Sequence, residues 1–245
     1  MTDADVIYVR NSLDEDVQYP DSDGQPMSDN TLQFDWIGLV KWAAEAYFRN
    51  APDVFVAGDH LIYPVEGDPA IRLAPDVYVS FGRPKGYRGS YQVWREAGVF
   101  PQVVFEVWSP RNRPDEMDAK RAFYDGYGAE EYYLLYPEFP AYAEGWVRGP
   151  GGALDRVPDM NGFTSPRLGF RFTLAGGELT IHGPDGRRLL RPDEVARERD
   201  EAEQARTAAE RELAAADAAR REAEARAERL AARLRELGVD PDAVG

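Results

Sequence analysis

The sequence contains no cysteine, which excludes disulfide bonds, thiolate metal sites and cysteine nucleophiles. Its only two histidines, His60 and His182, lie far apart in the chain, so a histidine-rich metal site and a Ser-His-Asp triad are both disfavoured. No apolar run approaches the roughly 18 residues that a membrane span requires. The acidic N-terminal stretch MTDADVIYVRNSLDEDVQ lacks the hydrophobic core of a signal peptide, so we expect a cytoplasmic protein that does not bind membranes.

Positive charge is also scarce, since 29 basic residues face 44 acidic ones and the net charge is −15. This balance argues against broad, non-specific binding to nucleic acid, which usually needs a basic surface, although it permits a local basic groove. Only three basic residues are lysines, Lys41, Lys85 and Lys120, and the others are arginines. A lysine that remains in such a composition is a candidate for a specific role.

With 245 residues, 43% of them hydrophobic, the chain can form one sizeable domain with an appendage. The composition changes after Arg191, because glycine, proline and aromatic residues are all absent from Asp193 to Leu237. Such a segment, dominated by alanine, glutamate and arginine, is typical of a long helix. We therefore predict four parts: a polar N-terminal segment (1–28), a folded domain (29–191), a long helix (192–238) and a C-terminal loop (239–245).

The apolar pattern of the folded domain predicts a mixed α/β (α+β) fold. Helical spacing runs from Asn30 to Asn50, and a second helix is expected from Pro114 to Tyr127. A loop is expected from Gly82 to Gly98. The predicted strands are 54–58 and 60–65, which read as a pair, and then 75–82, 102–108, 131–136, 141–149, 168–175 and 177–183. This order predicts a domain built on one mixed central sheet, flanked by helices, with additional antiparallel strands.

The long helix carries a heptad frame from Val195 to Leu237. Ten of its thirteen seam positions are apolar, but five of those ten are alanine and the other three positions are arginine. A weak coiled coil that makes a homodimer through residues 195–237 is therefore one interpretation. A single solvated helix that folds back or frays is the other.

The apolar strand PQVVFEVWSP contains one acid, Glu106, which shares a strand face with Val104 and Trp108. Asp76 begins another candidate strand, PDVYVS, and if the two strands are neighbours the two carboxylates come within about 5 Å. Two carboxylates that close are tolerated when a divalent cation lies between them or when one is protonated. Oxygen ligands suit Mg²⁺ or Mn²⁺.

The helix after this strand adds a cation. Met117, Lys120, Tyr124 and Tyr127 share one helix face, so Lys120 is expected on the side that packs against the sheet. There the ammonium could pair with the carboxylates, hold an attacking water or stabilise developing charge. Simpler interpretations remain open: a structural ion pair for Glu106, a turn residue at position 76, or a lysine that reaches water or pairs with Glu116.

The stretches APDVYVSFGRPKG, RGSYQVW and PQVVFEVWSPRNRPDEMDAKRAFYDGYGAEEYYLLYPE resemble the Uma-type family of restriction endonucleases, a branch of the PD-(D/E)XK nuclease superfamily. The resemblance runs from about Met27 to about Phe172, and the C-terminal helix ending in LRELGVDP is also similar to members of the family. Its most specific part is FEVWSP followed by Lys-x-x-x-Tyr and Gly-x-x-Glu-Tyr. The resemblance implies a restriction-endonuclease-like core: a helix, a sheet, a crossover helix and a further strand.

The resemblance also implies roles for individual residues. Asp76 and Glu106 correspond to the metal-binding acids, with the Val107 carbonyl as a further ligand. The common superfamily pattern has a lysine two residues after the glutamate, where this chain has Trp108, so Lys120 would reach the site from the helix instead. The acid that usually follows the EYWLV-like strand is also absent, since Tyr136 stands there. Glu45 on the first helix is a possible additional acid.

These residues predict a metal-dependent endonuclease, with DNA as the favoured substrate. Basic residues in two loops are possible contacts to the nucleic acid: Arg83, Lys85, Arg88, Arg111 and Arg113. A second hypothesis is a catalytically degenerate scaffold of the same fold that binds partners through the coiled coil. A third is a glycosidase that uses the two carboxylates, with Tyr132, Tyr133 and Trp146 for stacking on sugars.

Overall fold

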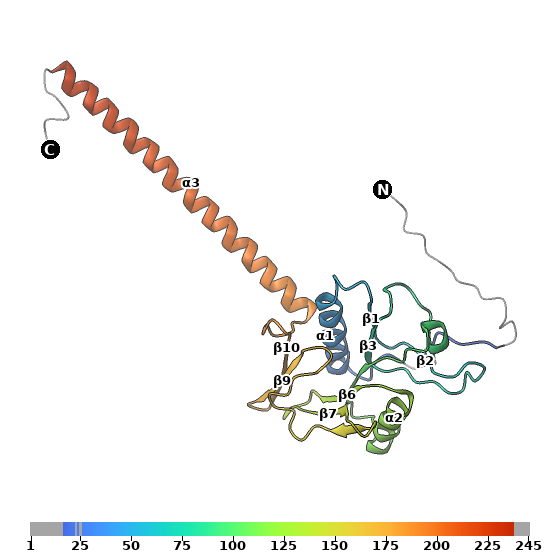
Figure 1. Cartoon of the computed structure of the whole chain (residues 1–245). Coiled ribbons are helices and arrows are strands. Elements are labelled where there is room, and N and C mark those ends of the chain that lie inside the picture. Colours follow the sequence, from blue (N-terminus) through green and yellow to red (C-terminus); the bar gives the residue numbers. More distant parts are fainter. Residues whose placement is uncertain (1–16, 23, 25, 238–245) are drawn as a thin grey trace. The chain divides into compact units, whose positions relative to one another are not determined.

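The computed structural model describes residues 17–22, 24 and 26–237, and the chain divides into two compact units between Arg191 and Pro192 (Figure 1). The first unit contains two long helices and every strand of the described chain, and the second is one long helix. Within the polar segment predicted over 1–28, the described residues 17–22, 24 and 26–28 form no helix or strand. The predicted loop 239–245 lies outside the described residues.

The described chain contains three α-helices, one short 3₁₀ helix and ten strands. The helices are α1 (Thr31–Tyr47), η1 (Val93–Glu96), α2 (Pro114–Tyr127) and α3 (Pro192–Glu236). The strands are β1 (Val54–Ala57), β2 (Ile62–Tyr63), β3 (Val77–Phe81), β4 (Tyr91–Gln92), β5 (Val103–Val107), β6 (Glu131–Tyr136), β7 (Tyr142–Arg148), β8 (Leu154–Arg156), β9 (Arg171–Ala175) and β10 (Glu178–His182).

A six-stranded sheet with the order β1-β3-β5-β6-β7-β8 forms the centre of the first unit. Only β5 and β6 are parallel, and every other neighbouring pair in this sheet is antiparallel. Parallel neighbours need a crossover connection, and α2 supplies it. The mixed sheet, the additional antiparallel strands and the long C-terminal helix confirm the predicted fold class.

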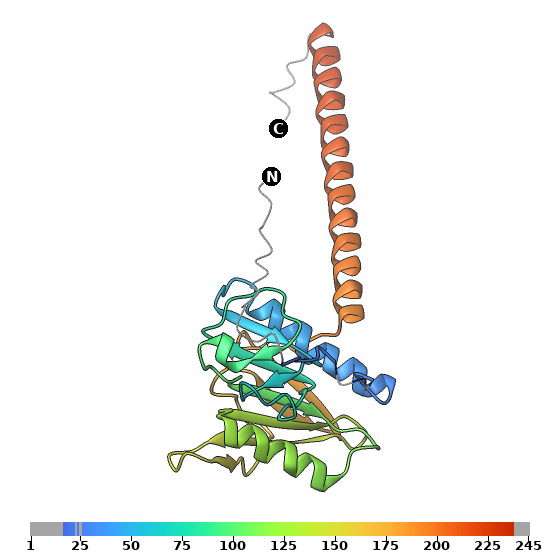
Figure 2. The same cartoon turned by 90° about the vertical axis from the view of Figure 1, so that its right-hand side faces the viewer.

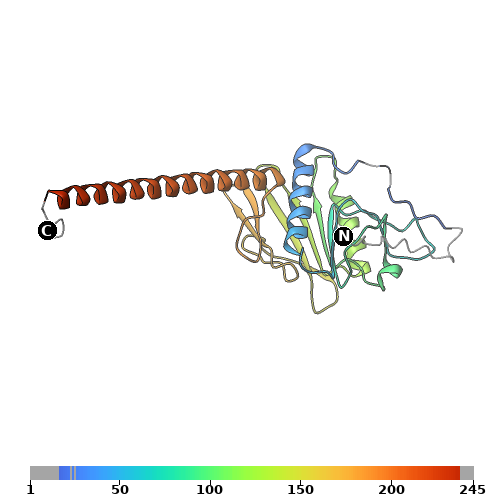
Figure 3. The same ribbon diagram turned by 90° about the horizontal axis from the view of Figure 1, so that it is seen from above.

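The two faces of this sheet pack against different helices (Figure 2). Val103, Phe105 and Val107 of β5 belong to the core that contains α1, and the β9–β10 hairpin covers the same face (Figure 3). Val104 belongs to the core that contains Met117 and Tyr124 of α2. Because successive strand residues alternate between faces, Glu106 lies on the α2 side.

Several predictions about the strands are wrong. The segments 54–58 and 60–65 do not pair, because β1 pairs with β3 while β2 forms a separate two-stranded parallel sheet with β4. A left-handed residue, Asp59 (φ 47°), separates β1 from β2, and its N–H bonds to the Pro75 carbonyl at 3.1 Å. The predicted loop 82–98 contains β4 and η1, and β8 was not expected. Strands of two or three residues are too short to show an alternating pattern.

The second unit is the helix α3, drawn in orange and red in Figure 1. None of its residues is buried, although it carries ion pairs at helical spacing such as Arg206–Glu210. Its apolar side chains are exposed: Val195, Leu213, Leu230, Leu234 and, just beyond its end, Leu237. Within the part of the chain that the structure describes, no helix combines the length and the hydropathy needed to cross a bilayer.

Candidate metal and catalytic site

The two acids predicted for the site lie on neighbouring strands. β3 and β5 run antiparallel, with Val77 opposite Phe105. The same register, extended by one residue, sets Asp76 opposite Glu106. Asp76 itself is half-buried, whereas Glu106 is 1% exposed. The condition on which the predicted pair depended, adjacency of the two strands, is therefore met.

The ladder between β3 and β5 ends at a proline, and this ending positions Asp76. In the register of β3 and β5, the residue opposite Val107 is Pro75. Pro75 has no N–H, and its carbonyl accepts the Asp59 N–H at 3.1 Å. Val107, at the corresponding end of β5, donates its N–H to Asp76 Oδ2 instead, at 2.6 Å. Gly58 permits the close approach of a third strand, since a Cβ there would lie 2.6 Å from the Asp76 carbonyl oxygen.

Glu106 is held by two side chains of α2. Lys120 Nζ donates to Oε2 at 3.0 Å, and the Tyr124 hydroxyl donates to Oε1 at 2.8 Å. Lys120 and Tyr124 are one turn apart, so a single face of α2 supplies both donors. The Lys120 side chain is 19% exposed, while that of Glu106 is only 2% exposed. Solvent therefore reaches the cluster from the side of the lysine.

The electrostatics of the cluster favour a protonated Asp76 in the absence of a metal. Burial, and then repulsion by Glu106, raise the pKa of Asp76 well above its ordinary value, against the lowering effects of the Val107 N–H and Lys120. Burial lowers the pKa of Lys120, but attraction by Glu106 and Asp76 outweighs it, so the net pKa is raised. Lys120 therefore stays an ammonium near neutral pH, and one cation faces two carboxyl groups.

Two tyrosines complete the polar surroundings of the acids. Burial, followed by the negative charge of Glu106, raises the pKa of Tyr124 well above its ordinary value, so it remains a hydroxyl donor. The Tyr132 hydroxyl is buried and has no hydrogen-bond partner in the described part of the chain. Burial, and then Glu106 and Asp76, raise the pKa of Tyr132 as well. Its ring lies 5.8 Å from that of Tyr124, so an unsatisfied hydroxyl lies on the same side of the sheet as the carboxylates.

Gln33 on α1 also reaches this site, and the sequence analysis missed it. Its Nε2 donates to the Val107 carbonyl at 2.9 Å, and its Oε1 accepts the Asp29 N–H at 2.8 Å. The Asn30 side chain in turn accepts the Gln33 N–H at 2.8 Å, which caps α1. The spacing Asn-x-x-Gln is a signal for a helix start and was available in the sequence. Nothing in that signal predicts the bond to Val107.

Replacing Gln33 with alanine is expected to lower the free energy of unfolding by about 1–3 kcal/mol, because the Val107 carbonyl loses its donor in a buried setting. Gln33 is only 6% exposed, so water has limited access to replace the amide. The measurement is chemical denaturation of the full chain. Gln204→Ala, at an exposed position of α3, serves as the control and should change this energy by less than about 0.5 kcal/mol. Equal stability of the two variants would contradict the role of Gln33.

Glu45, the additional acid predicted on the first helix, makes no hydrogen bond or ion pair with Asp76 or Glu106 in the described structure. It pairs with Lys41, four residues earlier on α1, and its side chain is 46% exposed. Twelve residues separate it from Gln33, which corresponds to about 18 Å along a helix. The N-terminal turn of α1 supplies the amide that bonds to Val107. The middle of α1 lies beside the strand of Asp76, because the Lys41 side chain and the Asp76 carbonyl both approach Gly58.

The basic residues predicted to contact nucleic acid fall into two groups. In the 82–98 segment, Lys85 Nζ bonds to the Val54 carbonyl at 3.0 Å, and Arg88 bonds to Glu96 at 2.5 Å. Arg83 lies 3.9 Å from the same Glu96. All three thus have partners within the domain.

The second group lies in the loop that enters α2. The side chains of Arg111 and Arg113 are 75% and 72% exposed. Arg111 lies 3.2 Å from Asp29, and Arg113 pairs with Asp115. These two guanidinium groups are open to solvent, and Arg113 can exchange its exposed partner Asp115 for phosphate at low cost.

Trp108 stands where the superfamily pattern has a lysine, and its ring stacks on Tyr136 at 5.3 Å. No cation therefore enters the site from β5. Two of the three aromatic residues considered for sugar stacking, Tyr132 and Tyr133, are fully buried, and Trp146 is partly buried. The burial of both tyrosines removes most of the sugar-binding surface that the glycosidase hypothesis required.

The site's oxygen atoms fit a divalent metal ion. Across the described residues, no group of three or more histidine, aspartate and glutamate side chains could hold a metal ion. The candidate ligands are thus the carboxylates of Asp76 and Glu106, together with the carbonyl of Val107, the residue that follows Glu106. Mg²⁺ is usually bound by one or two carboxylates, with waters and substrate phosphates as the other ligands. A divalent cation would also take the place of the proton that the raised pKa of Asp76 favours.

Comparisons with known proteins identify the family of this chain. A search of curated proteins gave no match. Among solved structures, the chain is similar to a "putative nuclease belonging to DUF820" from Anabaena variabilis, with 11% identity and a TM-score of 0.41 over 56% of this chain and 73% of that one. The family model Uma2, "Putative restriction endonuclease", matches residues 14–141. Restriction-endonuclease-like proteins generally use divalent metals. The match spans just over half of the 245 residues and includes both acids, Lys120 and Gln33, so the chain belongs to the Uma2 family.

Proposed function

We propose that this protein is a metal-dependent endonuclease that hydrolyses phosphodiester bonds in DNA. Membership of the Uma2 family supports nuclease activity. The observation that carries the proposal is the second carboxyl group: Asp76 faces Glu106, which Lys120 already pairs at 3.0 Å. A structural ion pair needs one carboxylate and one ammonium. The additional acid, with its raised pKa, has an explanation if a cation binds there.

Asp76, Glu106 and the Val107 carbonyl would hold Mg²⁺ or Mn²⁺. When bound, such an ion lowers the pKa of a coordinated water and neutralises phosphate charge. The protein orients these ligands through neighbours: the Val107 N–H fixes Asp76, and Gln33 fixes the Val107 carbonyl. The Tyr124 hydroxyl fixes the second oxygen of Glu106.

Lys120 acts as a cation and a hydrogen-bond donor in this proposal. Its raised pKa keeps it protonated, so it does not serve as the general base. An ammonium 3.0 Å from Glu106 can orient the attacking water and stabilise the charge that develops on the phosphate oxygens. Arg111 and Arg113, exposed at the entry to α2, would contact the DNA backbone.

A second candidate is a scaffold of the same fold without catalytic activity. The absence of a lysine at position 108 and the net charge of −15 favour it. In that case Lys120 and Glu106 would form a structural pair, and α3 would bind a partner. The cytoplasmic location expected from the sequence stays a prediction under either candidate.

The test is to incubate the full chain with supercoiled plasmid, linear duplex and single-stranded DNA, in Mg²⁺, Mn²⁺ or EDTA, and to measure metal binding by calorimetry. Cleavage that requires a divalent metal supports the nuclease. If the chain shows no metal binding and no cleavage, the nuclease proposal is overturned in favour of the scaffold. Metal binding without cleavage of any of these substrates would refute DNA hydrolysis and leave a metal-binding protein.

We also propose that α3 pairs with α3 of a second copy. Val195, Leu213, Leu230, Leu234 and Leu237 lie on one heptad frame and are 36–66% exposed, so pairing would bury them. Pairing would give an assembly with two candidate sites.

Replacing Leu230 and Leu234 together with glutamate is expected to convert the dimer to the 27.5 kDa monomer. The charges would fall on the proposed seam and repel their counterparts. The measurement is sedimentation equilibrium of the full chain. The matched control introduces the same charges on the opposite helix face, as Ala218→Glu with Ala232→Glu, and should remain dimeric. A monomeric wild-type chain would contradict the pairing.

A further inference from the structure

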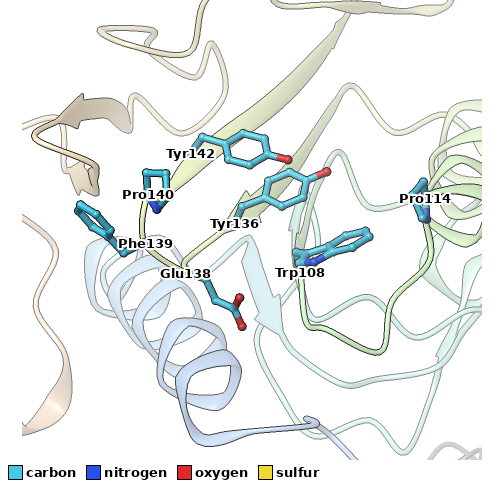
Figure 4. Close-up of a pocket in the computed structure, with 7 residues that line it drawn as sticks. All are labelled: Trp108, Pro114, Tyr136, Glu138, Phe139, Pro140 and Tyr142. Carbon is cyan, nitrogen blue, oxygen red and sulfur yellow. The ribbon is translucent and has the colours of Figure 1, made fainter.

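A ladder of three aromatic rings lies just beyond the candidate site, and no step of the proposed hydrolysis uses it. Trp108, at the end of β5, stacks on Tyr136 of β6 with ring centroids 5.3 Å apart. Tyr136 stacks on Tyr142 of β7 at 3.9 Å, with the rings nearly parallel at 11°. Figure 4 shows the three rings following one another, with Pro114 at the start of α2 on one side and Phe139 on the other.

These residues line a pocket of about 390 Å³, a volume within the usual range for small-ligand sites. The aromatic surface is not hidden: Tyr142 is 47% exposed and Phe139 is 79% exposed. Large aromatic rings gathered at the surface are uncommon unless they bind something, because burying them is favourable. Trp108 and Tyr142 cover the two faces of Tyr136, so the accessible aromatic surface that the pocket offers to a ligand lies at Tyr142 and Phe139.

The pocket lies next to the acids. Trp108 follows Glu106 by two residues and shares its strand face. The Trp108 N–H bonds to the Leu135 carbonyl at 2.8 Å, which continues the backbone pairing with β6 beyond the end of β5. Two strand residues span about 7 Å. A base stacked on the aromatic rings would therefore belong to the same substrate molecule as a phosphate at Asp76 and Glu106.

The charges around the pocket select a base rather than a phosphate. The one charged residue among those that line it is Glu138, which repels phosphate. Glu144, which accepts the Tyr136 hydroxyl at 3.0 Å, adds negative charge that Arg156 balances at 2.6 Å. The exposed Arg111 and Arg113 lie between Trp108 and Pro114 in the chain. Flat aromatic faces without a cation, beside a basic loop, suit stacked bases with their backbone on the arginines.

We propose that Trp108, Tyr136 and Tyr142 form a stacking site for an unpaired base of the substrate strand, so that the enzyme prefers single-stranded or locally opened nucleic acid. This inference rests on the proposed function. Bases inside a duplex are stacked on each other and cannot lie against a side chain, whereas every base of a single strand presents a face. Stacking is tolerant of sequence, so the site selects the state of the strand and not its sequence.

The test measures equilibrium binding of the full chain, carrying Asp76→Asn to prevent cleavage, to three labelled ligands in Mg²⁺. These are a mixed-sequence single strand, the same strand in a duplex, and a strand of equal length that lacks its bases. The variants are Tyr142→Ala, which removes the exposed ring, and Tyr142→Phe, which keeps it. Tyr87→Ala removes an 81% exposed aromatic residue of the 82–98 segment and is the matched control.

We expect the single strand to bind about tenfold or more tightly than the strand without bases, and Tyr142→Ala to remove most of that difference. Tyr142→Phe and Tyr87→Ala should bind like the parent. Equal binding of the two single strands, tighter binding of the duplex, or no effect of Tyr142→Ala would overturn the stacking site.

Cleavage by the wild-type chain separates this failure from failure of the proposed function. Metal-dependent cleavage together with base-independent binding would leave the nuclease in place and refute the stacking site. Tyr142-dependent binding to a single strand, without cleavage of any DNA, would support the stacking site and refute the nuclease.

Discussion

Asp76→Asn is expected to reduce Mg²⁺-dependent DNA cleavage by on the order of 10³-fold while leaving the fold intact. Asparagine keeps an oxygen that can accept the Val107 N–H, which now bonds to Asp76 Oδ2 at 2.6 Å. It removes the negative charge that would bind the metal. The measurement is single-turnover cleavage of the best substrate. Asp53→Asn, at an exposed position next to β1, is the control and should cleave like the wild type. A loss smaller than about tenfold would contradict the role of Asp76.

The same variant has a predictable effect on stability. Because the pKa of Asp76 is raised from 3.8, this group stabilises the metal-free fold fully at low pH, and that contribution is lost as the pH rises through the raised pKa. The Tm of the metal-free wild type should therefore fall relative to that of Asp76→Asn as the pH rises above 3.8 and through the raised pKa. Mg²⁺ should raise the wild-type Tm most at the upper end, since it replaces the proton. A pH trend of the opposite sign would refute this account.

Lys120→Met is expected to lower the free energy of unfolding by about 3 kcal/mol, or roughly 6–12 °C in Tm, and to abolish cleavage. The Glu106 side chain is 2% exposed and would lose its cation. The cost should fall at the lower end of the range for breaking buried pairs, because Lys120 is 19% exposed. Thermal and chemical denaturation of the full chain measure it.

Two further variants separate this effect from the loss of any lysine. Lys41→Met removes the ammonium that pairs with the exposed Glu45, and should cost less than about 1 kcal/mol. Glu106→Gln with Lys120→Met removes both charges of the buried pair, and should recover most of the stability but none of the activity. A double variant as unstable as Lys120→Met alone would show that the pair is not the source of the effect.

The main elements of the fold could be predicted because their signals are local. The helix expected from Pro114 to Tyr127 and the strand at 131–136 have the predicted bounds. The face that Lys120 takes followed from spacings of three and four along α2. The sequence predicted that Asp76 and Glu106 lie close together only if their strands are adjacent. Pro75 explains why the backbone hydrogen bonds between β3 and β5 stop where the two acids meet.

The rest depended on contacts between distant residues. Gln33 reaches Val107 across 74 positions of sequence, and its helix-capping role gave no sign of that bond. The role of Glu45 stays a prediction, since its observed partner is Lys41 and its side chain is 46% exposed. Tyr127, expected in the core with Met117, is 36% exposed, because it lies in the last turn of α2.

The position of Val107 carries a consequence for how activity can be lost in descendants of this sequence. Its N–H and C=O are satisfied by Asp76 and Gln33, at the point where β3 no longer provides a backbone partner. A lineage under selection for folding alone would still need an acceptor at position 76 and an amide at position 33. It could drop the carboxylate charge at no structural cost. Asparagine at position 76 is thus the substitution that we expect in descendants that keep the fold but have lost catalytic activity.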